Sequence, residues 1–198
     1  RFERHSGVDV LALGRAAWQL AANGRIVSGA STLSMQVTRL IEPRRERSIS
    51  AKLIQIARAI QIERRLSKTE ILNLYLTHAP YGGNLEGVRA ASFAYFGKEP
   101  KRLSIAESAL LVALPQSPEA RRPDRDPAAA LASRNNVLDR MLVAGVISAE
   151  EAEVAKGEPV PKARKEFPML AAHLAEAAMK AHPNDRVIAL PIDGKLQA

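Results

Sequence analysis

The chain has 198 residues, 46% of them hydrophobic and 25% charged, a range that excludes a wholly disordered or collagen-like protein. Cysteine is absent, which excludes disulfides, thiolate zinc sites and a nucleophilic cysteine. Lysine and arginine outnumber aspartate and glutamate by 29 to 21, and the net charge of +8 favours anionic partners.

Two helices are predicted in the first forty residues. The first begins after Asp9 and ends at Asn23-Gly24, because aspartate is a good N-cap and glycine commonly follows the last turn. The second covers residues 31–41 and is stopped by Pro43.

A third helix is predicted over residues 50–66. Its residues Leu53, Ile56, Ala57 and Ile60 have the i, i+3, i+4, i+7 spacing of a single buried stripe. This interpretation places Lys52 and Gln55 together on the other side of the helix.

The rest of the chain continues as helices with clear start signals. The S/T-x-x-E capping box occurs at 67–70 and 104–107, each time before an apolar run. Another helix begins at Asp126-Pro127 and ends at Gly145, and one more covers 148–156 before Gly157. Residues 157–166, rich in proline and lysine, are interpreted as a linker, and 187–190 as a strand.

These elements predict an all-α, mostly helical fold. The βαβ alternation of a Rossmann or barrel fold is missing, and no 20- to 50-residue period indicates a solenoid. The longest apolar run, 109–114, is far shorter than the roughly 20 residues that span a bilayer. We therefore expect no membrane-spanning segment in this sequence.

The positive charge is concentrated between residues 39 and 65. This stretch has eight basic and three acidic residues, a net of +5. Such a field attracts phosphates, whether of nucleic acid, anionic lipid or a pyrophosphate substrate. A solvated basic helix face is the simpler interpretation.

Most familiar catalytic motifs are missing. The sequence has no G-x-x-x-x-G-K-S/T phosphate loop, no H-E-x-x-H and no G-x-S-x-G, and its four histidines lack the spacing of metal ligands. The segment Gly29-Ala-Ser-Thr-Leu-Ser-Met-Gln36 is the exception, because small and hydroxyl residues gather at a helix entrance. Ser31 and Thr32 can cap this helix, and its free N–H groups and dipole favour an anion beside Arg39.

Four segments together resemble the motifs of the peptidoglycan glycosyltransferase family, glycosyltransferase family 51. Phe2-Glu-Arg-His5-Ser-Gly7 resembles the end of the first motif, E-D-x-x-F-x-x-H-x-G. Residues 29–36 resemble the second motif, G-x-S-T-x-T-Q-Q, with Ser34 and Met35 in place of Thr and Gln. Lys52-Leu-Ile-Gln55 stands where the third motif, R-K-x-x-E, belongs, and residues 70–82 resemble the fourth motif. The order of the motifs makes the resemblance specific. Met35, Lys52 with Gln55, and residues 79–83 resemble the 1C-type branch of class A penicillin-binding proteins.

The resemblance implies an activity and a set of site residues. The family polymerises lipid II into glycan strands and releases undecaprenyl pyrophosphate. Lys52 and Gln55 match catalytic positions. The positions that match substrate-binding residues are His5, Gly29, Ser31, Thr32, Gln36, Arg39, Arg47 and Lys52.

The resemblance also implies a context for the chain. It predicts a lysozyme-like glycosyltransferase domain over residues 1–156, with 157–198 as a linker and the start of a junction to a transpeptidase domain. The expected partners are lipid II, the growing glycan strand, an anionic membrane surface and that transpeptidase domain. The expected location is the periplasmic face of the inner membrane, with an anchor outside this sequence, and a divalent metal such as Mg²⁺ is left open.

Two departures from the family pattern bear on activity. The family's general-base glutamate aligns four residues before Phe2, ahead of residue 1, so we expect an N-terminally truncated domain that is inactive as it stands. Gln55 stands at the family's second carboxylate, and an amide neither accepts a proton nor carries charge. Replacing Gln55 with glutamate is expected to keep activity or raise it.

Two other functions remain open from the sequence. The basic stretch suits a nucleic-acid-binding helical module, although aromatic residues for stacking are few and no recognised nucleic-acid-binding signature occurs. A lysozyme-like hydrolase needs a pair of carboxylates, for which Glu70, Glu86 and Glu107 are candidates by charge. Two of these three lie in capping boxes.

Overall fold

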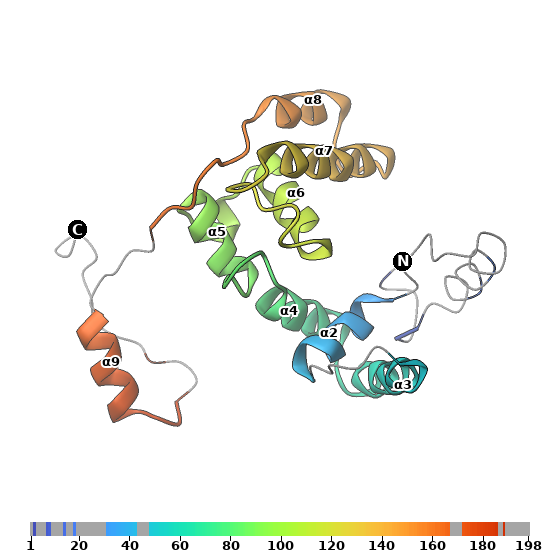
Figure 1. Cartoon of the computed structure of the whole chain (residues 1–198), viewed down its shortest axis with the longest axis vertical. Coiled ribbons are helices and arrows are strands. Elements are labelled where there is room, and N and C mark those ends of the chain that lie inside the picture. Colours follow the sequence, from blue (N-terminus) through green and yellow to red (C-terminus); the bar gives the residue numbers. More distant parts are fainter. Residues whose placement is uncertain are drawn as a thin grey trace.

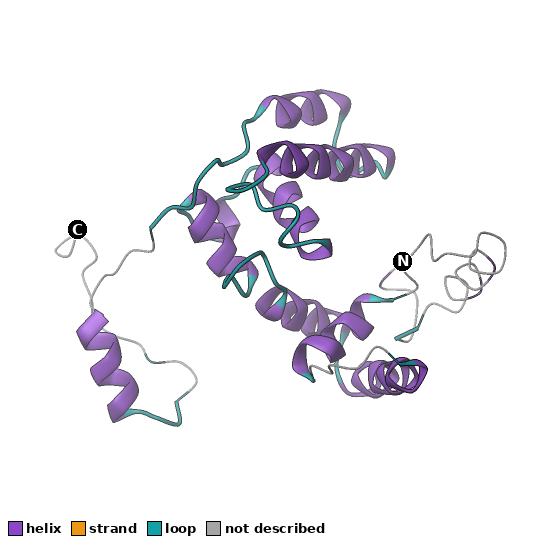
Figure 2. Cartoon of the chain, in the orientation of Figure 1, coloured by secondary structure: helices purple, strands orange, loops and turns teal. Residues whose placement is uncertain are grey.

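The computed structural model describes residues 2, 7–8, 14, 18, 31–42, 48–166, 172–185 and 188. These residues form helices and loops without a β-strand, apart from one isolated bridge between Pro80 and Glu86 (Figure 2). The predicted all-α fold class is therefore confirmed for this part of the chain. The predicted helix after Asp9 and the predicted strand at 187–190 lie outside the described residues, except for single positions.

Eight α-helices are described, and their positions agree closely with the capping signals. They are α2 (Leu33–Ile41), α3 (Ile49–Arg65), α4 (Lys68–His78), α5 (Val88–Phe96), α6 (Ile105–Ala113), α7 (Pro127–Val143), α8 (Ala149–Gly157) and α9 (Ala172–Ala181), with short 3₁₀ helices at Pro100–Arg102 and Leu114–Gln116.

Both predicted capping boxes form. At the starts of α4 and α6 the serine hydroxyl accepts from the backbone N–H of the glutamate, whose carboxylate accepts from the serine N–H. A third box, Ser148 with Glu151, begins α8. Asp126 caps α7 with Pro127 as the first helical residue, as predicted.

The predicted buried stripe of α3 is wrong. Leu53 is 61% exposed and Ala57 is also exposed, whereas Ala59 is fully buried. Helix α3 packs against α2 and its entrance with the face that carries Lys52, Gln55 and Glu63, which bond to Ser31, Met35 and Ser34. The small Ala59 lies against Gly7. A Cβ on Gly7 would lie 2.8 Å from the Ala59 carbonyl oxygen, so Gly7 is required there.

The helices form two groups joined by α5 (Figure 1). Helices α2, α3 and α4 contact one another, and α6, α7 and α8 form the second group. Helix α5 contacts both α4 and α6, and α9 lies apart from both groups in Figure 1. The motifs at 29–36 and 52–55 therefore belong to one group of helices.

The hydrophobic core is concentrated around α5–α8. One cluster joins α5 and α6 to the loop after α4 through Tyr81, Tyr95, Leu110 and Leu114. A second cluster joins α6, α7 and α8 around Leu138. Together the two clusters form the core of α5–α8, here called the α5–α8 body, which also packs against the loop after α4.

Residues 158–166, here called the C-terminal strap, pack on this body. The buried Arg134 of α7 donates to the backbone carbonyls of Lys156 and Glu158, which fixes the beginning of the strap. At its other end the Lys165 N–H donates to the Ala94 carbonyl over 2.6 Å. The sequence assigned these residues to a linker, and the boundary at 156/157 stays a prediction.

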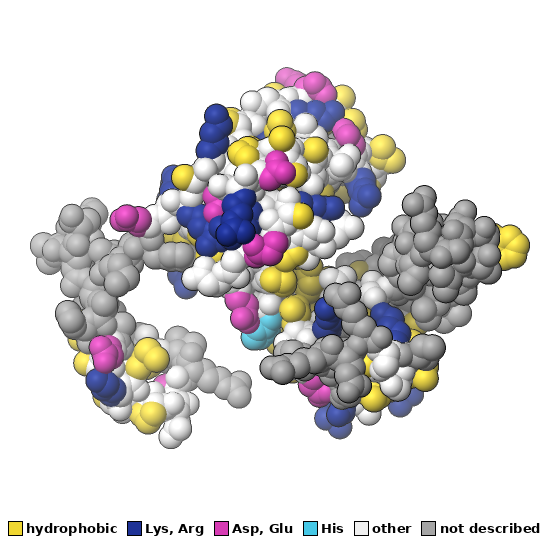
Figure 3. Space-filling model, in the orientation of Figure 1, with side chains coloured by type: hydrophobic (Ala, Val, Ile, Leu, Met, Phe, Trp, Pro, Cys, Tyr) yellow, Lys and Arg dark blue, Asp and Glu magenta, His cyan; other side chains and the backbone are white. Residues whose placement is uncertain are grey.

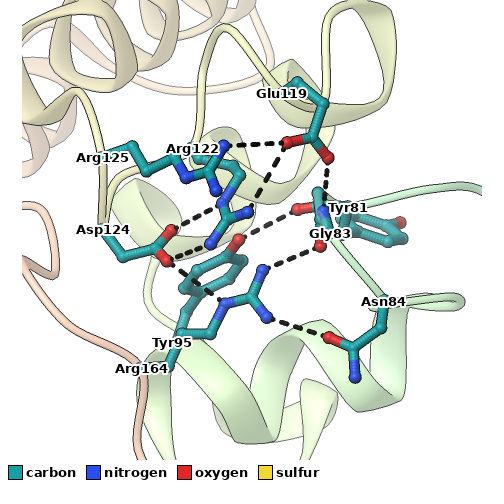
Figure 4. A network of polar contacts seen from close by, with 10 residues as sticks. Tyr81, Gly83, Asn84, Tyr95, Glu119, Arg122, Asp124, Arg125 and Arg164 are labelled. Atoms are coloured by element: carbon teal, nitrogen blue, oxygen red, sulfur yellow. Dashed lines mark hydrogen bonds and ion pairs between the residues drawn. The ribbon is translucent and has the colours of Figure 1, made fainter.

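Arg164 connects the strap to the loop after α4 (Figure 4). Its guanidinium donates to the Gly82 carbonyl over 2.8 Å and to the Asn84 side chain over 3.1 Å. Its Nε lies 3.4 Å from a carboxylate oxygen of Asp124, which also pairs with Arg122. Gly82 has a φ of +104°, and a Cβ there would meet Arg122, so glycine is required in this loop.

Candidate functional site

The candidate site lies where the beginnings of α2 and α3 meet. Thr32 caps α2: its hydroxyl accepts from the Met35 N–H over 3.2 Å and donates to the Gly7 carbonyl over 2.6 Å. Thr32 is thus buried in a contact between the first and second motifs. Ser31, directly before it, is exposed and does not cap the helix in this way.

Lys52 reaches from α3 to the entrance of α2. Its ammonium donates to the Ser31 hydroxyl over 2.6 Å and to Oε1 of Gln55 over 3.1 Å. Gln55 in turn donates from Nε2 to the Met35 carbonyl over 2.6 Å. The chain thus brings Ser31, Lys52 and Gln55 into one continuous set of hydrogen bonds.

The electrostatics of this set suit an anion. Burial lowers the pKa of Lys52 from its ordinary value, and the positive charge of Arg39 lowers it further. The ammonium is therefore partly desolvated and lies in the positive field of Arg39. An anion placed there would relieve both effects.

Gln36 and Arg39 follow on α2 and are exposed. Arg39 is close enough to Lys52 to act on its pKa. The remaining predicted site residues, His5, Gly29 and Arg47, lie outside the described residues. Their roles stay predictions.

A second polar cluster behind α2 was missed from the sequence. Ser34 is fully buried and donates its hydroxyl to Glu63 of α3. Lys68 of α4 pairs with the same carboxylate over 2.6 Å, and its ammonium lies 4.7 Å from the centre of the Phe2 ring. Glu63 is eight residues after Gln55, which is the helical spacing that puts both on one face of α3.

The described residues near Lys52 do not fit a divalent metal. An ammonium and a guanidinium already supply positive charge there, and the other groups are a hydroxyl and an amide. Within the described ranges no group of three or more His, Asp or Glu side chains is placed to hold a metal ion.

The three carboxylates considered for a hydrolase have other contacts. Glu70 and Glu107 belong to capping boxes, and Glu107 also pairs with Lys98 over 2.7 Å. Glu86 lies 2.8 Å from Nδ1 of His78. Two of the three carboxylates therefore cap the N-termini of helices.

No helix among the described residues is long and apolar enough to cross a bilayer.

Comparisons with known proteins identify relatives of the whole chain. A family profile described as transglycosylase matches residues 1–142. The chain is 45% identical over 196 residues to penicillin-binding protein 1C of Escherichia coli (strain K12), a match that covers 99% of this chain and 25% of the relative. It is 42% identical over 159 residues to penicillin-binding protein 1A of Pseudomonas aeruginosa, covering 80% and 19% of the two.

A solved structure also aligns with the chain. It is the crystal structure of penicillin-binding protein 1A from Haemophilus influenzae, with 25% sequence identity and a TM-score of 0.47, covering 77% of this chain and 20% of that one. The chain spans about a quarter or less of the length of these relatives.

Proposed function

The chain belongs to the transglycosylase family found in penicillin-binding proteins, and from that premise we propose that it is a peptidoglycan glycosyltransferase domain of the class A type. In this proposal it polymerises lipid II into glycan strands and releases undecaprenyl pyrophosphate. The observation that carries the proposal is the Lys52 ammonium, held by Ser31 and Gln55 beside Arg39.

Lys52 supplies what the departing group needs. The bond to the anomeric carbon breaks as negative charge develops on the pyrophosphate, and a fixed cation stabilises that charge most where water is partly excluded. Burial of Lys52 provides such a place, and Arg39 adds a second positive charge. These two positive charges therefore stabilise the transition state, in which the pyrophosphate departs, more than the bound ground state.

The α2 entrance adds orientation to this charge. Ser31 bonds to Lys52, and Thr32 caps the helix, so the N-terminal dipole of α2 points toward the same place. Gln36, one turn into α2, is exposed on the helix and suits contact with the sugar part of the donor. Proton abstraction from the attacking hydroxyl belongs to the first-motif glutamate that the resemblance places ahead of Phe2.

A membrane-facing side is proposed for the α2–α4 group. Hydrophobic side chains on α3 are exposed, with Leu53 at 61% and Ile54 at 39%, and so are Ile41 and Leu72. Figure 3 shows such side chains next to lysine and arginine over this group of helices. Apolar side chains interleaved with cations favour an anionic lipid surface, where lipid II is located.

The wider assignment follows from the family. We propose the periplasmic face of the inner membrane as the location, the growing glycan strand as a second substrate, and a transpeptidase domain as a covalent neighbour. The 45% identity to penicillin-binding protein 1C supports each of these.

Polymerisation of lipid II tests the proposal. The assay uses a protein that carries this chain together with a first-motif glutamate ahead of Phe2, and it follows glycan length and the release of undecaprenyl pyrophosphate. We expect both products in stoichiometric amounts. Hydrolysis of preformed glycan without polymerisation would replace the proposal with a hydrolase, and tight binding of DNA without either reaction would replace it with a nucleic-acid module.

A further inference from the structure

The amide of Gln55 has two different partners, and their chemistry fixes its orientation. A lysine ammonium only donates hydrogen bonds, and a backbone carbonyl only accepts them. Oε1 of Gln55 must therefore face Lys52, at 3.1 Å, and Nε2 must face the Met35 carbonyl, at 2.6 Å. The side chain acts as a bridge with one acceptor and one donor.

A carboxylate cannot form this bridge. An ionised glutamate has two acceptor oxygens, so one of them would face the Met35 carbonyl and repel it. That carbonyl also accepts a hydrogen bond from the Thr38 hydroxyl over 2.8 Å, so the side chains around it are donors. The position therefore favours an amide over the glutamate common in the family.

The bridge joins the two helices that make the candidate site. Met35 is fully buried in α2, and Gln55 and Lys52 lie one turn apart on α3. Fixing Gln55 to the α2 backbone thus fixes the amide oxygen that holds the Lys52 ammonium. Ser31 holds the same ammonium from the other side.

We propose that Gln55 is a positioning residue: its amide bridge from the Met35 carbonyl to Lys52 holds the ammonium where the pyrophosphate departs. The proposal rests on the function proposed above and makes it specific. Gln55 moves no proton, and the chemistry needs an amide at this position in this chain.

Two substitutions test the bridge. Gln55→Glu keeps the acceptor for Lys52 but removes the donor, and Gln55→Met keeps the length without either. Gln61→Glu is the matched control, because Gln61 is exposed on the same helix and accepts from Arg58. The polymerisation assay gives kcat and KM for each variant between pH 5.5 and 8.5, with melting temperatures alongside.

We expect a kcat about ten- to a hundredfold lower for Gln55→Glu at pH 8.5, the effect of one lost hydrogen bond in a charged network. Its ratio to the parent should stay low throughout this pH range, because the Lys52 ammonium lowers the pKa of the introduced carboxyl and keeps it ionised. Gln55→Met should lose a similar factor at every pH, and Gln61→Glu should match the parent.

A parent-like kcat at pH 8.5 for either folded Gln55 variant would overturn the bridge. If Gln55→Glu does not fold, Gln55→Met decides in the same way. A second readout needs no turnover: titration of ¹³C-labelled Lys52 by NMR in the 198-residue chain should show a higher pKa in Gln55→Glu and a lower one in Gln55→Met. Unchanged Lys52 titration in both would contradict the bridge, whereas a parent without polymerisation contradicts only the proposed function.

Discussion

The ammonium nitrogen of Lys52 lies 2.6 Å from the hydroxyl oxygen of Ser31, although the two residues are 21 positions apart. This contact joins the second motif to the third and places a partly desolvated cation at the entrance of α2. The proposed chemistry depends on this relationship.

Ser31→Ala tests the contact directly. The substitution removes one of the two described acceptors that hold the ammonium, and a hydrogen bond of this kind contributes about 1 kcal/mol. We expect turnover of lipid II to fall about three- to tenfold with little change in melting temperature. Ser108→Ala on α6 serves as the control, and equal activities of the two variants would show that Ser31 does not hold Lys52 for the reaction.

The pH dependence of anion binding follows from the lowered pKa of Lys52. The ammonium exists below its pKa, so binding of inorganic pyrophosphate by the 198-residue chain should weaken at a lower pH than an ordinary lysine would allow. Lys52→Arg keeps its charge to far higher pH, because the pKa of a guanidinium lies well above that of an ammonium. Calorimetric titrations with pyrophosphate from about pH 7 to 10 should show that the parent loses affinity at alkaline pH and that Lys52→Arg does not.

If both proteins lose pyrophosphate affinity at the same pH, Lys52 is not the cation that holds the anion. Raising the salt concentration provides a further control, since an ionic contact weakens as the screening length falls to about 10 Å at 0.1 M.

Glu63→Gln tests the cluster behind α2. The Glu63 side chain is 7% exposed, accepts from Ser34 and pairs with Lys68, so losing its charge breaks a largely buried ion pair between α3 and α4. We expect a loss of about 2 kcal/mol in the free energy of unfolding by urea. The control, Glu150→Gln at an exposed position of α8, should lower the free energy of unfolding far less. If Glu63→Gln lowers it no more than the control does, Glu63 does not stabilise the fold.

Arg164→Ala should loosen the C-terminal strap. The variant loses hydrogen bonds to the Gly82 carbonyl and the Asn84 side chain, and we expect about 2 kcal/mol lower stability and faster trypsin cleavage after the exposed Lys162. Arg125, exposed and 3.6 Å from Glu119, is the control position. Cleavage at the parent's rate would show that Arg164 does not hold the strap.

Asp124 should make the same network sensitive to acid. Its hydrogen bonds to Arg122 lower the pKa of the carboxyl below its ordinary value. A depressed folded-state pKa adds stability above the ordinary value near 4, and this contribution is lost as the pH falls through the depressed pKa. The melting-temperature difference between the parent and Asp124→Asn should therefore shrink below about pH 4. A constant difference from neutral pH down to about pH 3 would exclude this role.

The sequence predicted the helix starts well and one packed face badly. Caps such as Ser67 with Glu70 are local, so a few residues decide them. The buried face of α3 depends on which parts of the chain meet it. Hydrophobic spacing alone favoured burial of Leu53, whereas the structure buries Ala59, where Gly7 comes close. Tertiary contact therefore overrode the periodicity.

The candidate site was predictable in position but not in detail. Motif resemblance indicated Lys52 and Gln55 as site residues, and the structure brings them together with Ser31. The donor to Met35 could not be predicted, because a backbone carbonyl on another helix has no sequence signature. That contact reverses the expectation for Gln55→Glu from retained activity to loss.

The most direct test of the central claim is the turnover of Lys52→Ala. In a protein that carries the chain with its first-motif glutamate, we expect release of undecaprenyl pyrophosphate from lipid II to fall at least about a hundredfold, the usual effect of removing a group that stabilises developing charge. The melting temperature should stay close to that of the parent, and the exposed Lys101→Ala should keep full activity. Parent-like turnover by Lys52→Ala would contradict the account.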